Sequence, residues 1–195
     1  MSASLPLIIF VIAGLFSPGP NVVMLTASGA RFGFKATTPH LLGVPIGTGL
    51  LAAASALGLS ATLLAAPTLK LVFQIGAAIW ILWLAWKTAL AGRAGRAEDR
   101  GKPFTFREAI LFQAVNPKVW AITLAASAGF GIGLAPHLEA LRLFIAFAGV
   151  NLFVCLFWTT VGHLLSGVLQ SDKVWRVFMT FMALVMASTV VLIFL

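Results

Sequence analysis

The stretch SPGPN, residues 17–21, interrupts an apolar run over residues 5–28 and decides the fold. Two prolines around a glycine remove two backbone donors, so a regular helix cannot continue through them. In hydrocarbon, the carbonyl groups that this frees must be satisfied by protein or by water in a cavity. We therefore expect the break to face inward, with a second helical segment starting at Pro20 or Asn21. Unpaired N–H groups at such a start carry a partial positive charge and favour an anion.

The composition around this break is that of a membrane protein. Of 195 residues, 61% are hydrophobic and 9% are charged, whereas a soluble domain has about 45–50% apolar and about 25% charged residues. This excludes an ordinary soluble enzyme or binding module, and also a disordered chain, which needs few apolar residues. The single cysteine, three histidines and five acids predict no intrachain disulfide, no metal site and no cofactor. We expect an all-α integral membrane protein.

Six apolar stretches are each long enough to cross a bilayer, because about 20 helical residues span its core. They cover residues 5–28, 41–66, 69–91, 109–132, 141–169 and 174–195. The first is expected to be retained, since residues 1–4 carry no Lys or Arg and no cleavage site precedes polar sequence. We predict one transmembrane domain over residues 1–195, with a first repeat at 5–91, a linker at 92–107 and a second repeat at 108–195.

The basic residues predict the orientation in the membrane. The net charge is +8, but Lys and Arg lie mostly between apolar runs, which argues against nucleic-acid binding. Ten of the thirteen lie in the connections after the first, third and fifth stretches, against Lys70 and Arg142 on the opposite side. The positive-inside rule places these ten in the cytoplasm and both termini outside. We expect a multi-pass membrane protein.

A second break follows at Asn116-Pro117-Lys118, in the fourth stretch. Pro117 again breaks the hydrogen-bond ladder, and Asn116 offers both donors and an acceptor. An ammonium such as Lys118 inside a span costs a few kcal/mol and usually marks a pathway or a paired site. The alternative is that its long stem carries the charge to the head groups.

The two breaks open two groups of three predicted spans, and an odd number of spans per group gives the groups opposite orientations. Proline- and glycine-interrupted spans at matching positions of inverted halves point to the central site of a transporter. We therefore predict two inverted three-helix repeats. The glycine pair Gly43 and Gly47 has the spacing that lets helices approach closely, and we expect it to serve packing.

At these motifs the chain resembles the LysE/RhtB family of bacterial amino-acid exporters. The family's Pro-Gly-Pro-Asn signature stands at residues 18–21 and is followed by spaced glycines, and its Asn-Pro-Lys signature stands at residues 116–118. The resemblance implies a location in the bacterial inner membrane and export of amino acids or related metabolites from the cytoplasm. It also implies an ion gradient, usually of protons, as the energy source, because no GxxxxGK[ST] nucleotide loop occurs.

Our hypothesis places a small zwitterion between the two broken spans. Its carboxylate meets the helix start after the first break and its ammonium meets freed carbonyls at the second. With no Asp or Glu inside a span, we favour a neutral amino acid. Lys118 binds the carboxylate or exchanges the coupled proton, and His163 is the other proton candidate. The candidate substrate-binding residues are Pro18, Gly19, Pro20, Asn21, Asn116, Pro117, Lys118 and Asn151.

Several alternatives stay open at this level. Gln113 and Asn151 each fit an interhelical hydrogen bond as well as a ligand. A structural or assembly protein without transport has the same composition, and transport could run inward. An intramembrane serine hydrolase would use Ser60, in a Gly-Leu-Ser-Ala stretch, with His163 as base. A homodimer is a further expectation for so small a bundle.

Overall fold

The computed structural model describes residues 4–17, 19–59, 67–90, 101–167, 171–188 and 190–191. The regular elements within these ranges are all helical, as the sequence predicts. They are α1 (Ser4–Phe16), α2 (Pro20–Phe32), α3 (Phe34–Ala54), the wider turn η1 (Ser55–Leu59), α5 (Pro67–Ala89), α6 (Phe106–Val115), α7 (Pro117–Gly129), α8 (Pro136–Leu165) and α9 (Asp172–Ser188).

Both predicted breaks are present. The axes of α1 and α2 differ by 58°, and those of α6 and α7 by 68°. Pro20 is the first residue of α2 and Pro117 the first residue of α7, because proline has no N–H to lose at that position and its φ already suits a helix. Pro18 lies outside the described residues.

Two helices in the described ranges are long and apolar enough to cross a membrane, namely Phe34–Gly58 and Pro136–Leu165. Each bent pair adds one candidate if it counts as a single span, which gives up to four. The all-helical membrane class is thus confirmed. The full layout of six spans in two inverted repeats stays a prediction.

Most of the helices begin earlier than the apolar stretches predicted as spans, and α3, α8 and α6 do so by three residues or more. Helix α3 starts at Phe34 and not near residue 41, because Gly33 at φ 81° ends α2 and turns the chain directly into the next helix. Helix α6 starts at Phe106, inside the predicted linker. Its start is fixed by a capping box in which Thr105 Oγ1 accepts from the Glu108 N–H at 3.3 Å and Glu108 Oε2 accepts from the Thr105 N–H at 2.8 Å.

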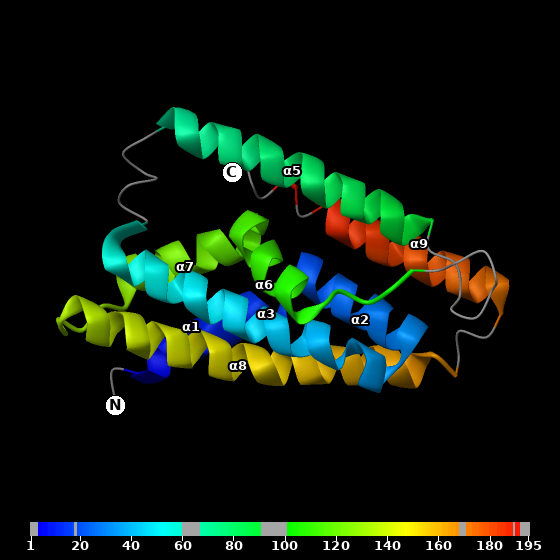
Figure 1. The fold of residues 1–195 in the computed structure, drawn as a ribbon, viewed down its shortest axis with the longest axis horizontal. Coiled ribbons are helices and arrows are strands. Elements are labelled where there is room, and N and C mark those ends of the chain that lie inside the picture. The colour runs from blue at the N-terminus through cyan, green and yellow to red at the C-terminus, as the bar shows by residue number, and fades with distance from the viewer. Residues whose placement is uncertain are drawn as a thin grey trace.

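The helices are arranged around the two broken pairs (Figure 1). The long helices α3 and α8 pack against each other, and α5 packs on α9 as a separate pair. Helices α2, α6 and α7 lie between these two pairs in the view of Figure 1. One apolar core joins α5 and α9 to the middle layer through Val23, Ile81, Phe112 and Met186. A second core, around Phe147, joins α1 and α7 to α8.

Close packing of α3 on α6 depends on a missing side chain. A Cβ atom at Gly47 would lie 2.7 Å from Gln113 Cγ and 2.8 Å from the Ile110 carbonyl oxygen, and one at Gly43 would lie 2.7 Å from Ala109 Cβ. The packing role predicted for this glycine pair is therefore confirmed. The close contact at Gly43 and Gly47 holds the first half of the chain against the second, beside the break at Asn116.

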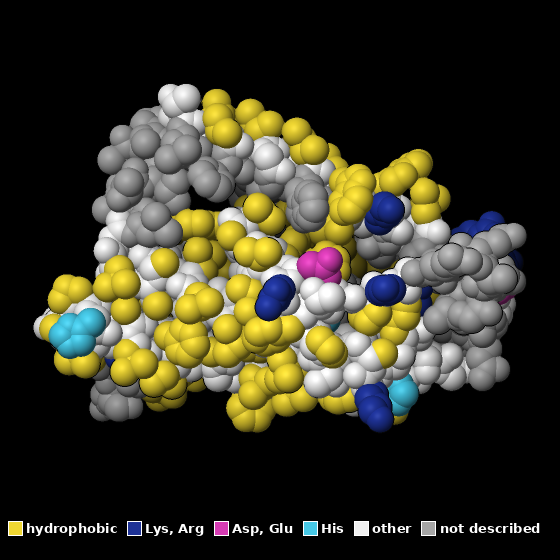
Figure 2. Space-filling model, viewed as in Figure 1, with side chains coloured by type: hydrophobic (Ala, Val, Ile, Leu, Met, Phe, Trp, Pro, Cys, Tyr) yellow, Lys and Arg dark blue, Asp and Glu magenta, His cyan; other side chains and the backbone are white. Residues whose placement is uncertain are grey.

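Apolar side chains are spread across the face shown in Figure 2, and most of its Lys and Arg side chains lie in the right half. Large apolar side chains such as Phe153, Leu164 and Leu111 are exposed. Many exposed apolar side chains of this size fit lipid as the surrounding medium.

We expect Gly47→Ala to lower the thermal unfolding midpoint of the purified protein, because the new methyl group meets α6 and such overpacking costs about 1–3 kcal/mol. Gly149→Ala is the matched control. Gly149 lies in α8 with nothing within 4 Å of a Cβ position, so this change should leave the midpoint unchanged or raise it through helix propensity. Equal midpoints for the two variants would contradict the packing role of Gly47.

Candidate functional site

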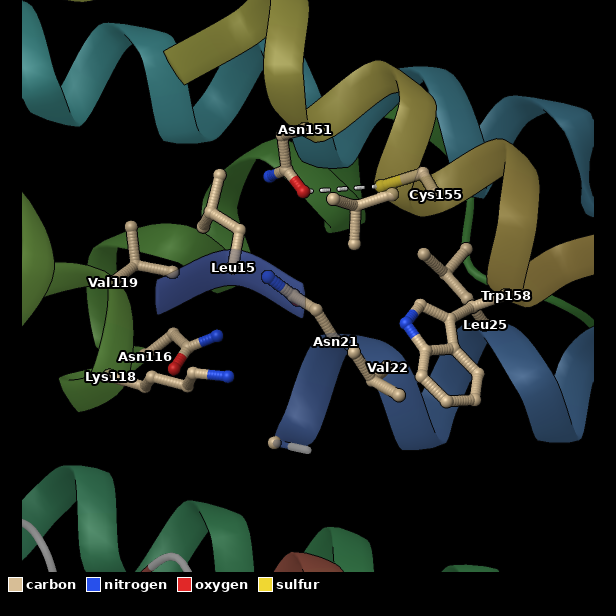
Figure 3. Close-up of a pocket in the computed structure, with 12 residues that line it drawn as sticks. Leu15, Asn21, Val22, Leu25, Asn116, Lys118, Val119, Asn151, Cys155 and Trp158 are labelled. Carbon is tan, nitrogen blue, oxygen red and sulfur yellow. Dashed lines mark hydrogen bonds between the residues drawn. The ribbon is translucent and has the colours of Figure 1, made fainter. Parts of the chain in front are cut away.

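A small cavity lies between the two breaks and α8 (Figure 3). Its volume of about 20 Å³ gives room for about one water molecule. Five of the residues predicted for the site line it: Gly19, Asn21, Asn116, Lys118 and Asn151. They come from three parts of the chain, and the structure brings them together as the sequence analysis requires. An amino acid is too large for such a volume.

Lys118 reaches from α7 into the break between α1 and α2. Its Nζ donates a hydrogen bond to the Ser17 carbonyl oxygen, one of the groups at the interrupted helix end. Gly19 leaves the room for this stem, because a Cβ there would lie 2.7 Å from Lys118 Cδ and 3.0 Å from Nζ. The ammonium of the second half thus lies in the break of the first half, rather than being turned away from it.

Asn21 joins the same two halves through its amide. Its Nδ2 donates to Gln113 Oε1 at 2.8 Å, and Gln113 Nε2 donates back to Asn21 Oδ1 at 3.2 Å. Gln113 also donates to the Ala109 carbonyl at 2.9 Å. For Gln113 the interhelical alternative is therefore the observed one. Asn21 both lines the cavity and links α2 to α6.

Two helix starts at the cavity lack side-chain caps. Neither α2 nor α7 receives a side-chain hydrogen bond at its N-cap among the described residues, unlike α6 with its capping box. The N-cap of α7 is Asn116, which is 1% exposed, and its Oδ1 has no hydrogen-bond partner in the described part of the chain. A buried acceptor without a donor is costly, so this amide is a group that a ligand or a water would satisfy.

Asn151 lines the cavity from α8 and is held at both ends of its amide. Its Nδ2 donates to Thr48 Oγ1 of α3 at 2.9 Å, and its Oδ1 accepts from Cys155 Sγ at 3.6 Å. Both the interhelical and the cavity-lining interpretation of Asn151 therefore fit. The second lone pair of Oδ1 is the part of this side chain that could still serve a ligand.

The sequence also matches those of known proteins. Residues 12–194 match the family described as LysE type translocator. The chain belongs to this family. It is also 28% identical over 155 residues to the cysteine/O-acetylserine efflux proteins of Escherichia coli (strain K12) and of Salmonella typhimurium (strain LT2), a match that covers 76% of this chain and 76% of each relative. No solved structure matches the chain.

Family membership makes this translocator a multi-pass membrane transporter and not an enzyme. The serine hydrolase alternative is accordingly set aside. Its nucleophile Ser60 lies outside the described residues, and its base His163 is exposed near the end of α8, beside Gly33. His163 is not among the residues that line the cavity, so the structure separates this proton candidate from Lys118. Pro20 and Pro117 shape the helix starts without lining the cavity.

The apolar wall of the translocator's cavity was not predicted from the sequence. This wall includes Val154, Cys155 and Trp158 of α8. The buried Nε1 of Trp158 has no hydrogen-bond partner among the described residues. A usable signal existed, because Cys155 and Trp158 follow Asn151 by four and seven residues and so share its helix face.

We expect a double-mutant cycle on Asn21→Leu and Gln113→Leu to show coupling of about 0.5–1.5 kcal/mol in the free energy of unfolding, since either single change leaves the other amide unpaired. Unfolding of the purified translocator in mixed micelles measures it. The control cycle pairs Asn21→Leu with Thr38→Val, whose hydroxyl bonds to the Phe34 carbonyl within α3, and should be additive. Additivity in both cycles would disprove the amide pair.

Proposed function

We propose that this translocator exports small neutral amino acids from the cytoplasm by alternating access, driven by the proton gradient. The observation that carries the proposal is the cavity between the two breaks. It combines two uncapped helix starts, an unpartnered amide oxygen and one ammonium. This set complements a carboxylate and an amino group held on one carbon. The names of the relatives, which specify cysteine and O-acetylserine efflux, support small zwitterions as the class.

The substrate carboxylate is proposed to bind at the start of α2. There the Pro18-Gly19-Pro20 break leaves N–H groups without a side-chain cap, and a helix N-terminus favours negative charge. Asn21, in the first turn of α2, lines the cavity with its amide. The substrate's amino group is proposed to meet Asn116 Oδ1, the acceptor left without a partner beside Pro117.

Lys118 is the proposed coupling group. The Ser17 carbonyl now accepts from its ammonium. The ammonium of a substrate has three N–H donors, so it would donate to this carbonyl as well as to Asn116 Oδ1. Substrate and Lys118 would therefore compete for one carbonyl. Such competition links substrate entry to the state of Lys118 and supports exchange of a substrate for a proton. Asn151, fixed between α3 and α8, is proposed to complete the site.

Helix packing supports the two inverted repeats that alternating access requires. In the proposed repeats, the pair α1–α2 corresponds to α6–α7, α3 corresponds to α8, and α5 corresponds to α9. Helix α3 then packs on its counterpart α8, and α5 packs on its counterpart α9. The contact of α3 with α6 corresponds to that of α8 with α1, and the contact of α2 with α8 to that of α7 with α3. A cavity as small as about 20 Å³ must widen before a substrate enters, and rocking of the halves would widen it.

The proposed orientation places the basic connections in the cytoplasm, and it can be tested by labelling. In a Cys155→Ser background, Lys102→Cys marks the predicted cytoplasmic linker and His137→Cys the opposite end. We expect a membrane-impermeant maleimide to label position 137 in intact spheroplasts and position 102 only after the membrane is opened, because the positive-inside rule keeps basic loops inside. The reverse pattern would overturn the orientation.

The function itself is tested by efflux. Cells with and without the protein are loaded with dipeptides, and extracellular amino acids are followed by mass spectrometry. We expect small neutral amino acids, cysteine and serine among them, to appear faster only with the protein, and dissipating the proton gradient to abolish the difference. Unchanged profiles across the panel would refute export of amino acids, and faster disappearance from the medium would indicate uptake.

In the same assay we expect Lys118→Met to lower the export rate about tenfold or more, because a charged hydrogen bond is lost. Asn21→Ala should also lower it. Lys102→Met is the control, since Lys102 is exposed and remote from the cavity lining, and should export normally. Blotting of membranes confirms equal amounts of each variant. Normal export by Lys118→Met would contradict the proposed coupling role of Lys118.

A further inference from the structure

Trp158 carries a hydrogen-bond donor that nothing in the described protein uses. Its Nε1 is buried without a partner, and the residue lines the cavity between the breaks. Trp120 provides the contrast, since its Nε1 donates to the Ala114 carbonyl at 2.8 Å. An indole N–H only donates, and a buried donor without an acceptor is costly. The Trp158 N–H therefore points to an acceptor that arrives with a ligand.

The Trp158 ring is held in place by two other rings. Its centroid lies 5.7 Å from that of Phe16 and 5.3 Å from that of Phe157, and these two phenylalanines lie 5.0 Å apart. Phe16 is the last residue of α1. Aromatic packing of this kind fixes ring orientation, so the N–H is presented in a defined direction at the edge of the first break.

Figure 3 shows how the polar groups are distributed around the cavity. Asn116 and Lys118 lie on one side and Trp158 on the opposite side, with Asn21 between them. The labelled residues on the same side as Trp158 are Val22, Leu25 and Cys155, and all three line the cavity. The apolar wall, with the Trp158 N–H as its donor, is therefore separate from the groups that suit the amino and carboxylate ends of a zwitterion.

We propose that Trp158 recognises the substrate's side chain. Its N–H donates a hydrogen bond to one acceptor atom of that side chain, and its ring limits the size of the side chain. The ligand class is then small amino acids whose side chain ends in a hydrogen-bond acceptor, such as a hydroxyl or an ester oxygen. This inference rests on the proposed function and deepens it. It predicts discrimination between L-serine and L-2-aminobutyrate. Serine carries a hydroxyl group where 2-aminobutyrate carries a methyl group of similar size.

The test compares these two ligands in wild type and in Trp158→Phe, by competition in efflux and by ligand-induced thermal stabilisation of the purified protein. We expect wild type to favour L-serine, and Trp158→Phe to reduce that preference about five- to tenfold, as loss of one hydrogen bond implies. The serine-to-aminobutyrate ratio does not depend on how much variant folds. Trp86→Phe, at an exposed position of α5, should keep the wild-type ratio.

The size limit is tested with Trp158→Leu, which should let leucine compete where it does not in wild type. An unchanged serine preference in Trp158→Phe overturns the inference, and so does an equal loss for both ligands, which would place the N–H on the shared carboxylate. Export of both ligands by wild type without preference also overturns it while leaving the proposed function intact. If wild type neither exports nor is stabilised by any amino acid, the proposed function and this inference are both wrong.

Discussion

A carbonyl group left without its helical partner at a break inside a membrane must find a donor in the protein or in cavity water, and this constraint shapes the centre of the molecule. At the second break the Trp120 indole donates to the Ala114 carbonyl, so that half supplies its own donor. At the first break the donor to Ser17 is Lys118, which belongs to the other half. The second half thus supplies the hydrogen-bond donor that the first break needs. Gly19 leaves room for it, because the Lys118 stem occupies the space where a Cβ atom would lie.

The remaining buried polar groups divide into those that tie helices together and those that are left over. The Asn21–Gln113 amide pair, the Asn151–Thr48 bond and the Ser55–Thr123 bond each join the first half to the second. Asn116 Oδ1 and Trp158 Nε1 have no partner within the described residues, and both residues line one cavity. Both ring nitrogens of His40 and the Thr159 hydroxyl are likewise buried without a partner in the described part of the chain, but these residues do not line the cavity. An unpartnered buried group costs about 1–3 kcal/mol, and Asn116 Oδ1 and Trp158 Nε1 are the two that a ligand in this cavity could satisfy.

The sequence predicted the parts of this arrangement that depend on backbone chemistry. Proline and glycine act locally, so both breaks and both helix restarts could be placed from residues 17–21 and 116–118 alone. Asn151 could be named because amides are rare in spans, but its bond to Thr48 depends on how α3 packs against α8. Trp158 was missed because an aromatic residue in an apolar run has many equivalent explanations, and only the packed structure shows that its N–H lacks an acceptor. Helix starts at Phe34 and Phe106 were misplaced because hydropathy reports lipid contact, whereas a glycine turn and a capping box decide where helices begin.

The small volume of the cavity fits the proposed exchange of donors at the same carbonyl. Lys118 now donates to the Ser17 carbonyl across the first break. A zwitterion brings one ammonium and one carboxylate, which can replace the bond from Lys118 and also use the uncapped start of α2. The empty and loaded states would then satisfy the same backbone groups with different donors. Two packings that satisfy the same groups would lie close in free energy, which is the condition that the proposed alternating access requires.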